Sequence, residues 1–195
     1  MKPKKLFKIL VIYSFSIIVL SLIITLKVMA YEEVNYEVVK QNKVYEIRKY
    51  SNRLAIETIT SKQGSSFRKL FNYISGNNEN KEKISMTTPV TQIEKKGSMT
   101  MQFYLPSKFN KDNTPSPSNP DVKILNIKGG YYAVIKYSGR ASDKNFIKHK
   151  DILKNELKKN DILILSSPIK ATYDKPFTLP ILRRNEAMFK MDMNL

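Results

Sequence analysis

The sequence of 195 residues contains no cysteine and only one histidine, His149. The lack of cysteine excludes disulfides, thiolate nucleophiles, cysteine-ligated zinc, iron–sulfur clusters and lipidation of an N-terminal cysteine. Neither a P-loop nor a dinucleotide-binding fingerprint is present. A lone histidine supplies no recognisable pair of nucleophile and base. We therefore predict no catalytic residues and no metal site.

Acidic residues are scarce. The chain has 17 Asp and Glu against 34 Lys and Arg, which gives a formal charge of +17. Residues 1–30 hold five lysines and no acid, so +12 remains on residues 31–195. Such a basic protein favours anionic partners, namely nucleic acid, acidic lipid headgroups or a carboxylated ligand such as haem. A lysine-rich composition that only maintains solubility explains the charge equally well.

Charged side chains are missing altogether from the stretch Ile9–Leu26, which follows a lysine-rich N-terminus. Its 18 residues approach the thickness of a bilayer's hydrocarbon core, so we expect it to enter a membrane. The preceding lysines favour the cytoplasmic side, which places the rest of the chain on the other side. Val28-Met29-Ala30 is compatible with cleavage. We predict that residues 1–30 are a signal peptide or an anchor, and that residues 31–195 form an exported or membrane-anchored domain.

Short segments of alternating polarity begin after residue 31 and predict β-strands. The expected strands are 34–40, 44–50, 54–60, 90–93, 99–105, 122–127, 131–137, 162–165, 169–173 and 186–191. The first two are expected to form a hairpin. A loop rich in Pro, Ser and Asn over residues 106–120 separates two halves of the domain.

Helical spacing of apolar residues occurs once in each half. A short helix is predicted from Phe67, Leu70, Phe71 and Ile74; it is capped by Ser65 or Ser66 and ends at Gly76. A longer helix is predicted in the second half, at residues 142–159. The repeated order of strands, helix and strands predicts an α+β fold. We expect a distorted antiparallel β-barrel with two helices, built from two pseudo-symmetric halves.

Several motifs then support a family resemblance. In chain order they are Tyr45-Glu46-Ile47-Arg48-Lys49-Tyr50, residues 67–78, Met86-Thr87-Thr88-Pro89-Val90, Phe103-Tyr104-Leu105-Pro106 and Arg183-Arg184-Asn185-Glu186. Together they resemble the SOUL haem-binding family over about residues 34–192. The resemblance implies a fold similar to gyrase-inhibitor-like ligand-binding domains. It also implies haem, or a related porphyrin, as a non-covalent ligand.

The resemblance further implies a haem surface that includes Phe67 and Phe71 on the first helix, with Arg68 beside them. Two rings one helical turn apart suit a flat porphyrin, and a neighbouring cation suits a propionate. Tyr173 and Phe177 are additional positions that the resemblance suggests. The competing interpretation is that Phe67 and Phe71 belong to the core-facing stripe of their helix.

Axial ligation of haem iron is not expected to be strong. Some members of the family carry a proposed histidine ligand in the opening strand, where this sequence has Lys49. His149 lies close to the apolar face of the second helix and is more simply a residue at the boundary of the core. Met86 is a weaker candidate. Any haem is therefore expected to bind without a strong protein ligand.

The function predicted from these observations is reversible carriage or buffering of haem, without enzymatic activity. One alternative is a module that binds another small molecule, a protein or an anionic surface. Another is a hydrolase in which Glu57 or Glu186 acts as a pocket base. No nucleic-acid partner is expected, because the membrane segment separates the domain from chromosomal DNA, and the sequence does not indicate an oligomeric state.

Overall fold

The computed structural model describes residues 13–14, 31–60, 63–95 and 97–193. Contacts divide the chain into two compact units, Met1–Tyr31 and Glu32–Leu195. The expected membrane segment Ile9–Leu26 lies outside the described residues except for Tyr13 and Ser14, which are helical. Among the helices in the described part of the chain, none has the length and apolar character needed to cross a membrane.

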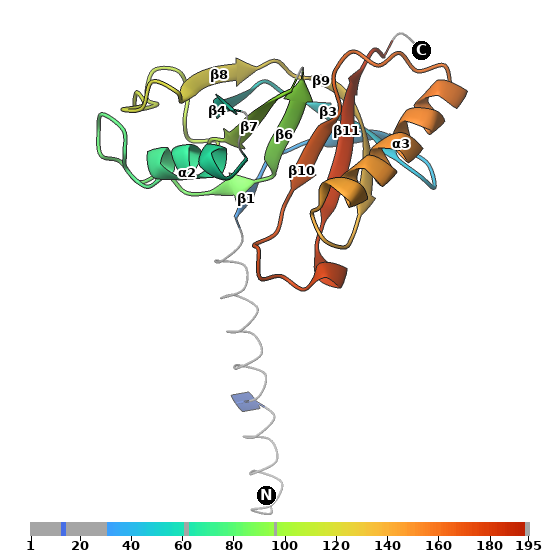
Figure 1. The fold of residues 1–195 in the computed structure, drawn as a ribbon, viewed down its shortest axis with the longest axis horizontal. Helices are drawn as coiled ribbons and strands as arrows, with labels where there is room; N and C mark the ends of the chain where they lie inside the picture. The colour runs from blue at the N-terminus through green and yellow to red at the C-terminus, as the bar shows by residue number, and fades with distance from the viewer. Residues whose placement is uncertain (1–12, 15–30, 61–62, 96, 194–195) are drawn as a thin grey trace, which may run out of the picture. The chain divides into compact units, whose positions relative to one another are not determined.

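Eleven strands and two α-helices make up the described part of the second unit (Figure 1). The strands are β1 (Glu32–Glu33), β2 (Glu37–Gln41), β3 (Glu46–Tyr50), β4 (Arg53–Thr60), β5 (Thr87–Thr88), β6 (Val90–Lys95), β7 (Ser98–Tyr104), β8 (Lys123–Ile127), β9 (Gly130–Tyr137), β10 (Ile169–Thr172) and β11 (Asn185–Met191). The helices are α2 (Gln63–Ile74) and α3 (Asp143–Lys159), with a short 3-10 helix η1 (Pro180–Leu182).

Nine of the strands form one curled sheet in the order β2-β3-β9-β11-β10-β6-β7-β4-β8. The units β4-α2-β6-β7 and β9-α3-β10-β11 are arranged symmetrically about the adjacent strands β6 and β10. The strand that precedes each unit in the chain pairs with the first strand of the other unit. Thus β3, which precedes β4, pairs with β9, and β8, which precedes β9, pairs with β4. The predicted fold is confirmed as an antiparallel half-barrel with two helices and two related halves.

Both helices cover the same face of the sheet. The strand residues beneath each helix are cross-strand partners, and such partners point to the same side of a sheet. Under α2, Ile56 and Phe103 are paired partners in a buried cluster with Leu70 and Ile74. Under α3, Ala187 and Ile135 are paired partners in a second cluster with Leu153 and Leu157. Burial of these apolar stripes stabilises both helices, as the hydrophobic periodicity predicts.

Two local predictions were wrong. The first helix begins at Gln63, so Ser65 and Ser66 lie within its first turn; Ser66 is buried, and the Ser65 hydroxyl lies 3.4 Å from that of Thr60. The segment 162–165 forms only a single bridge, between Ile164 and Met191. β10 already pairs with the same edge of β11 up to Met188, so little of that edge remains.

The opposite face of the sheet is polar and rich in tyrosine. Glu57 pairs with Gln102, Gln102 pairs with Thr91, and the same face continues across β10 to Glu186 on β11. Near β3 and β9 the face carries Arg48 together with a buried cluster that includes Tyr50 and Tyr132. Arg48 and Glu186 are fully buried, so their charges require partners inside the protein.

A buried ion pair between Arg48 and Glu186 provides those partners. Arg48 Nη1 and Nη2 donate to Glu186 Oε2 and Oε1 at 2.9 and 3.0 Å, and both residues are 0% exposed. Arg48 Nε also donates to Glu46 at 2.8 Å. Glu186 additionally accepts from Arg184 Nε at 3.0 Å and from the Tyr173 hydroxyl at 2.7 Å. The pair therefore links β3 to β11 across the intervening β9.

Replacing Arg48 with methionine should lower the free energy of unfolding by about 3 kcal/mol, because Glu186 stays buried without its two-point partner. Urea denaturation followed by circular dichroism measures the loss. Lys49→Met is the matched control, since Lys49 is exposed on the same strand, and it should change stability by less than about 0.5 kcal/mol. Equal stability of the two variants would show that the pair does not hold the sheet together.

Candidate functional site

The outer face of α2 carries two phenylalanines that the core does not cover. Phe67 is 43% exposed and Phe71 is 48% exposed, whereas Leu70 and Tyr73 on the inner face are almost fully buried. The Phe67 and Phe71 rings stack with centroids 5.9 Å apart and an interplanar angle of 14°. Phe67 also meets the buried Phe103 edge to face at 5.2 Å. Both rings thus leave about half of their apolar surface exposed to solvent.

Cations flank these rings on the same helix. Arg68 is exposed and forms no ion pair with any carboxylate of the described residues. Lys69, by contrast, is held by Asp121, with its Nζ 2.7 Å from Oδ2. Arg68 is therefore the available cation beside the aromatic surface, and its guanidinium suits a ligand carboxylate.

Tyr173, another predicted ligand residue, is engaged in the polar face of the sheet. Its hydroxyl donates to Glu186, and the Arg184 guanidinium lies 3.8 Å from its ring centroid. Burial raises the pKa of Tyr173 far above its usual range, and the adjacent Glu186 carboxylate raises it further. Because tyrosine ligates haem iron as a phenolate, these surroundings oppose such a role.

Phe177 lies in the loop between β10 and β11 and is 96% exposed. It lines a cavity of about 550 Å³ together with Arg140, Leu179 and Arg183. Tyr173, Phe177 and the α2 rings therefore have different surroundings: the structure brings Phe67 and Phe71 together but shows no contact between this pair and Tyr173 or Phe177. The part that Tyr173 and Phe177 play in ligand binding stays a prediction.

The residues considered as axial ligands are used in packing. His149 stacks on Tyr137, with ring centroids 4.1 Å apart, and its Nδ1 lies 2.8 Å from the Asn145 carbonyl oxygen. Met86 is partly buried against the core under α2. Lys49, which stands where some relatives carry a proposed histidine ligand, is exposed near the ring of Tyr131. No group of three or more potential metal ligands occurs within the described residues.

The two glutamates considered as catalytic bases are also engaged. Glu186 accepts four hydrogen bonds from Arg48, Arg184 and Tyr173, which leaves its carboxylate saturated. Glu57 is half-buried and accepts a 3.0 Å hydrogen bond from Gln102 Nε2. Neither arrangement places a nucleophile beside a base, as covalent hydrolysis requires.

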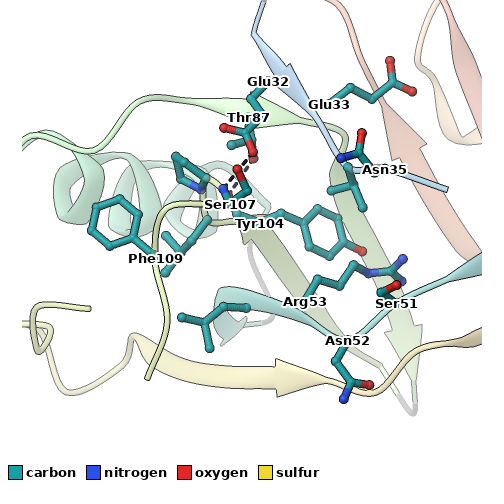
Figure 2. Close-up of a pocket in the computed structure, with 14 residues that line it drawn as sticks. Glu32, Glu33, Asn35, Ser51, Asn52, Arg53, Thr87, Tyr104, Ser107 and Phe109 are labelled. Atoms are coloured by element: carbon teal, nitrogen blue, oxygen red, sulfur yellow. Dashed lines mark hydrogen bonds between the residues drawn. The ribbon is translucent and has the colours of Figure 1, made fainter. Parts of the chain in front are cut away.

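Sequence reasoning missed a cavity of about 320 Å³ that is bordered by β1, the start of β4 and the segment after β7 (Figure 2). The Arg53 guanidinium lies within 4.2 to 5.2 Å of the ring centroids of Tyr50, Tyr104 and Tyr132. Its Nε and Nη1 make no hydrogen bond within the described residues, and the three aromatic rings lie around the guanidinium. The volume is at the lower end of the range for small-molecule pockets, about 300 to 1,000 Å³. No short motif in the sequence signals this cage.

The residues on the outer face of α2 match the two chemical parts of a porphyrin, its ring and its propionates. Haem offers a flat apolar ring and two carboxylates, and α2 offers stacked rings with an adjacent exposed arginine. The fit concerns the ring and the propionates, because the candidate iron ligands are engaged elsewhere. Bound haem would supply the redox and ligand-binding chemistry of its iron.

Solved structures with the same fold include the C-terminal domain of EcmrR, at 13% identity and a TM-score of 0.58, covering 80% of this chain and 98% of that chain. A hydrolase from Listeria innocua matches at 7% identity and a TM-score of 0.55, covering 79% of this chain and 94% of that chain. At these identities the likeness concerns the fold alone.

Sequence relatives are more specific. Heme-binding protein 2 of Mus musculus is 30% identical over 167 residues, which cover 77% of this chain and 78% of the mouse protein. The model of the SOUL heme-binding protein family matches residues 31–190, which include the α2 surface, the Arg48–Glu186 pair and the loop that bears Phe177. The chain belongs to the SOUL heme-binding protein family.

Proposed function

We propose that this protein binds haem reversibly on the outer face of α2 and serves to carry or buffer it. Family membership supports haem as the ligand, and the mouse relative is itself a heme-binding protein. The observation that carries the location is the stacked and half-exposed pair Phe67 and Phe71. An apolar ring pair of this kind gains free energy when a flat ligand removes it from water.

Reversibility is the expected consequence of the ligand set. Phe67, Phe71 and Arg68 contact the porphyrin ring and a propionate, but none of them ligates iron. Binding then rests on apolar burial and one charge-assisted hydrogen bond, so release does not require a metal–ligand bond to break. Such a site suits transfer between donors and acceptors more than permanent retention.

We infer a binding role without catalysis. The Glu186 carboxylate is saturated by basic and phenolic donors, and Glu57 is bonded to Gln102. The hydrolase among the structures of similar fold is too distant in sequence to transfer its activity. Binding by a surface of α2 agrees with the lack of a nucleophile and base in the sequence.

Titration of hemin into residues 31–195, followed at the Soret band, should show saturable binding at one site. Phe67→Ala and Phe71→Ala should each weaken affinity about tenfold, because each removes one half of the stacked surface. Leu163→Ala is the control, since Leu163 is 61% exposed on the loop after α3. Absence of saturation, or equal weakening by all three variants, would refute a haem site on α2.

Arg68 and Lys69 provide a matched pair of charge variants. Arg68→Gln should weaken hemin affinity about threefold to tenfold, the range of one hydrogen bond at an exposed site, whereas Lys69→Gln should have a smaller effect because Asp121 holds Lys69. The difference should vanish with the dimethyl ester of hemin, which has no free carboxylates. If it persisted with the ester, Arg68 would not contact a propionate.

A further inference from the structure

The loop that connects β10 to β11 exposes an unusual amount of apolar surface. Phe177 is 96% exposed, Leu179 64%, Ile181 78% and Leu182 69%. These are four large apolar side chains within six residues, and Figure 1 shows the loop projecting beyond the ends of its two strands. Contiguous exposed apolar side chains mark a contact surface on a folded protein.

The loop is held in this shape by its own hydrogen bonds. Arg183 Nε donates to the Thr178 carbonyl oxygen at 2.7 Å, and Arg183 also donates to the Pro176 carbonyl oxygen. The amide of Gly139 donates to the Pro180 carbonyl oxygen at 2.8 Å, which ties the loop to the end of β9. The loop is therefore ordered without a partner, so that binding costs it little further conformational entropy.

Basic side chains border the apolar tip. Lys175 precedes Phe177, Arg183 follows Leu182, and Arg140 lines the same cavity as Phe177. The one acid of the loop, Asp174, accepts a hydrogen bond from the Arg184 amide at 2.6 Å. An apolar tip with a positively charged border complements the headgroup region of an anionic bilayer.

The loop also lies beside the point where the chain enters the domain. Arg184, at the end of the loop, makes a two-point ion pair with Glu33 of β1, at 2.9 and 3.0 Å. The loop and β1, the strand that follows the segment expected to enter a membrane, therefore lie on the same side of the domain.

We propose that the tip of the β10–β11 loop, formed by Phe177, Leu179, Ile181 and Leu182, inserts into the headgroup region of an anionic phospholipid bilayer. Lys175 and Arg140 would contact lipid phosphates around it. A bilayer fits the observations better than a protein partner, because the tip projects, has a basic border and adjoins the chain's entry into the domain. This lipid-docking role is independent of haem binding on α2.

The absence of cysteine allows a site-specific test. Residues 31–195 contain all three buried clusters of the domain, so this chain is suitable. Phe177→Cys labelled with nitrobenzoxadiazole should brighten and shift to the blue on vesicles of phosphatidylglycerol and phosphatidylcholine, and less so at high salt. Leu163→Cys with the same label is the control, since Leu163 is 61% exposed on another loop and should not respond.

Cosedimentation measures the contribution of the tip to binding. Phe177→Ser/Ile181→Ser should lower partitioning onto these vesicles about tenfold or more, given the apolar area removed. Leu163→Ser/Leu165→Ser, which removes two exposed apolar side chains elsewhere, should leave it unchanged. No response of the label at 177, or equal responses at 177 and 163, would overturn the proposal. A dimer on gel filtration that only the loop variant abolishes would instead assign the tip to a second copy of the chain.

Discussion

The ion pair between Arg48 and Glu186 is the constraint around which the polar half of the domain is organised. Removing two charges from water costs several kcal/mol for each ion, and good geometry with further hydrogen bonds is needed to offset it. The structure meets this demand with Glu46, Arg184 and Tyr173 around the pair. Because Arg48 is on β3 and Glu186 on β11, the same requirement fixes β3, β9 and β11 side by side.

This internal pairing separates the domain into a structural face and ligand-facing edges. Glu186 is paired with Arg48 and accepts a hydrogen bond from Tyr173 within the polar face. Glu186 is therefore not available to a substrate, and Tyr173 is not available as a phenolate. Two features with exposed apolar side chains lie outside this face in the described part of the chain. They are the stacked rings on α2, with Arg68, and the apolar tip of the β10–β11 loop. Ligand contact is therefore expected on the helix and the loop.

Much of the fold could be predicted from the sequence, because hydrophobic periodicity reports local structure directly. Both helices and nearly all of the sheet strands arose from alternation or from helical spacing. The prediction of a strand at 162–165 was wrong. Its sequence alternates as a strand does, but β10 already occupies most of the available edge of β11. That competition for an edge depends on contacts between distant parts of the chain, which periodicity does not contain.

The site was harder to predict for a related reason. Spacing placed Phe67 on the same side of the helix as Leu70, but only the packed structure shows that Leu70 is buried while the two phenylalanines remain half-exposed. Alternation in β3 puts Glu46, Arg48 and Tyr50 on one face, which was a usable signal for the buried charges. No comparable signal identified Arg53 within its three tyrosines, since those rings come from three different strands.

The most direct test of the central claim is a map of the porphyrin contact surface by ¹H–¹⁵N correlation spectra of residues 31–195 with gallium protoporphyrin IX. The largest amide shift changes should fall on Phe67, Arg68 and Phe71 and on the strand residues beneath them. Little change is expected around Arg53. Changes confined to the Arg53 cavity or to the loop, with α2 unaffected, would contradict a haem site on this helix.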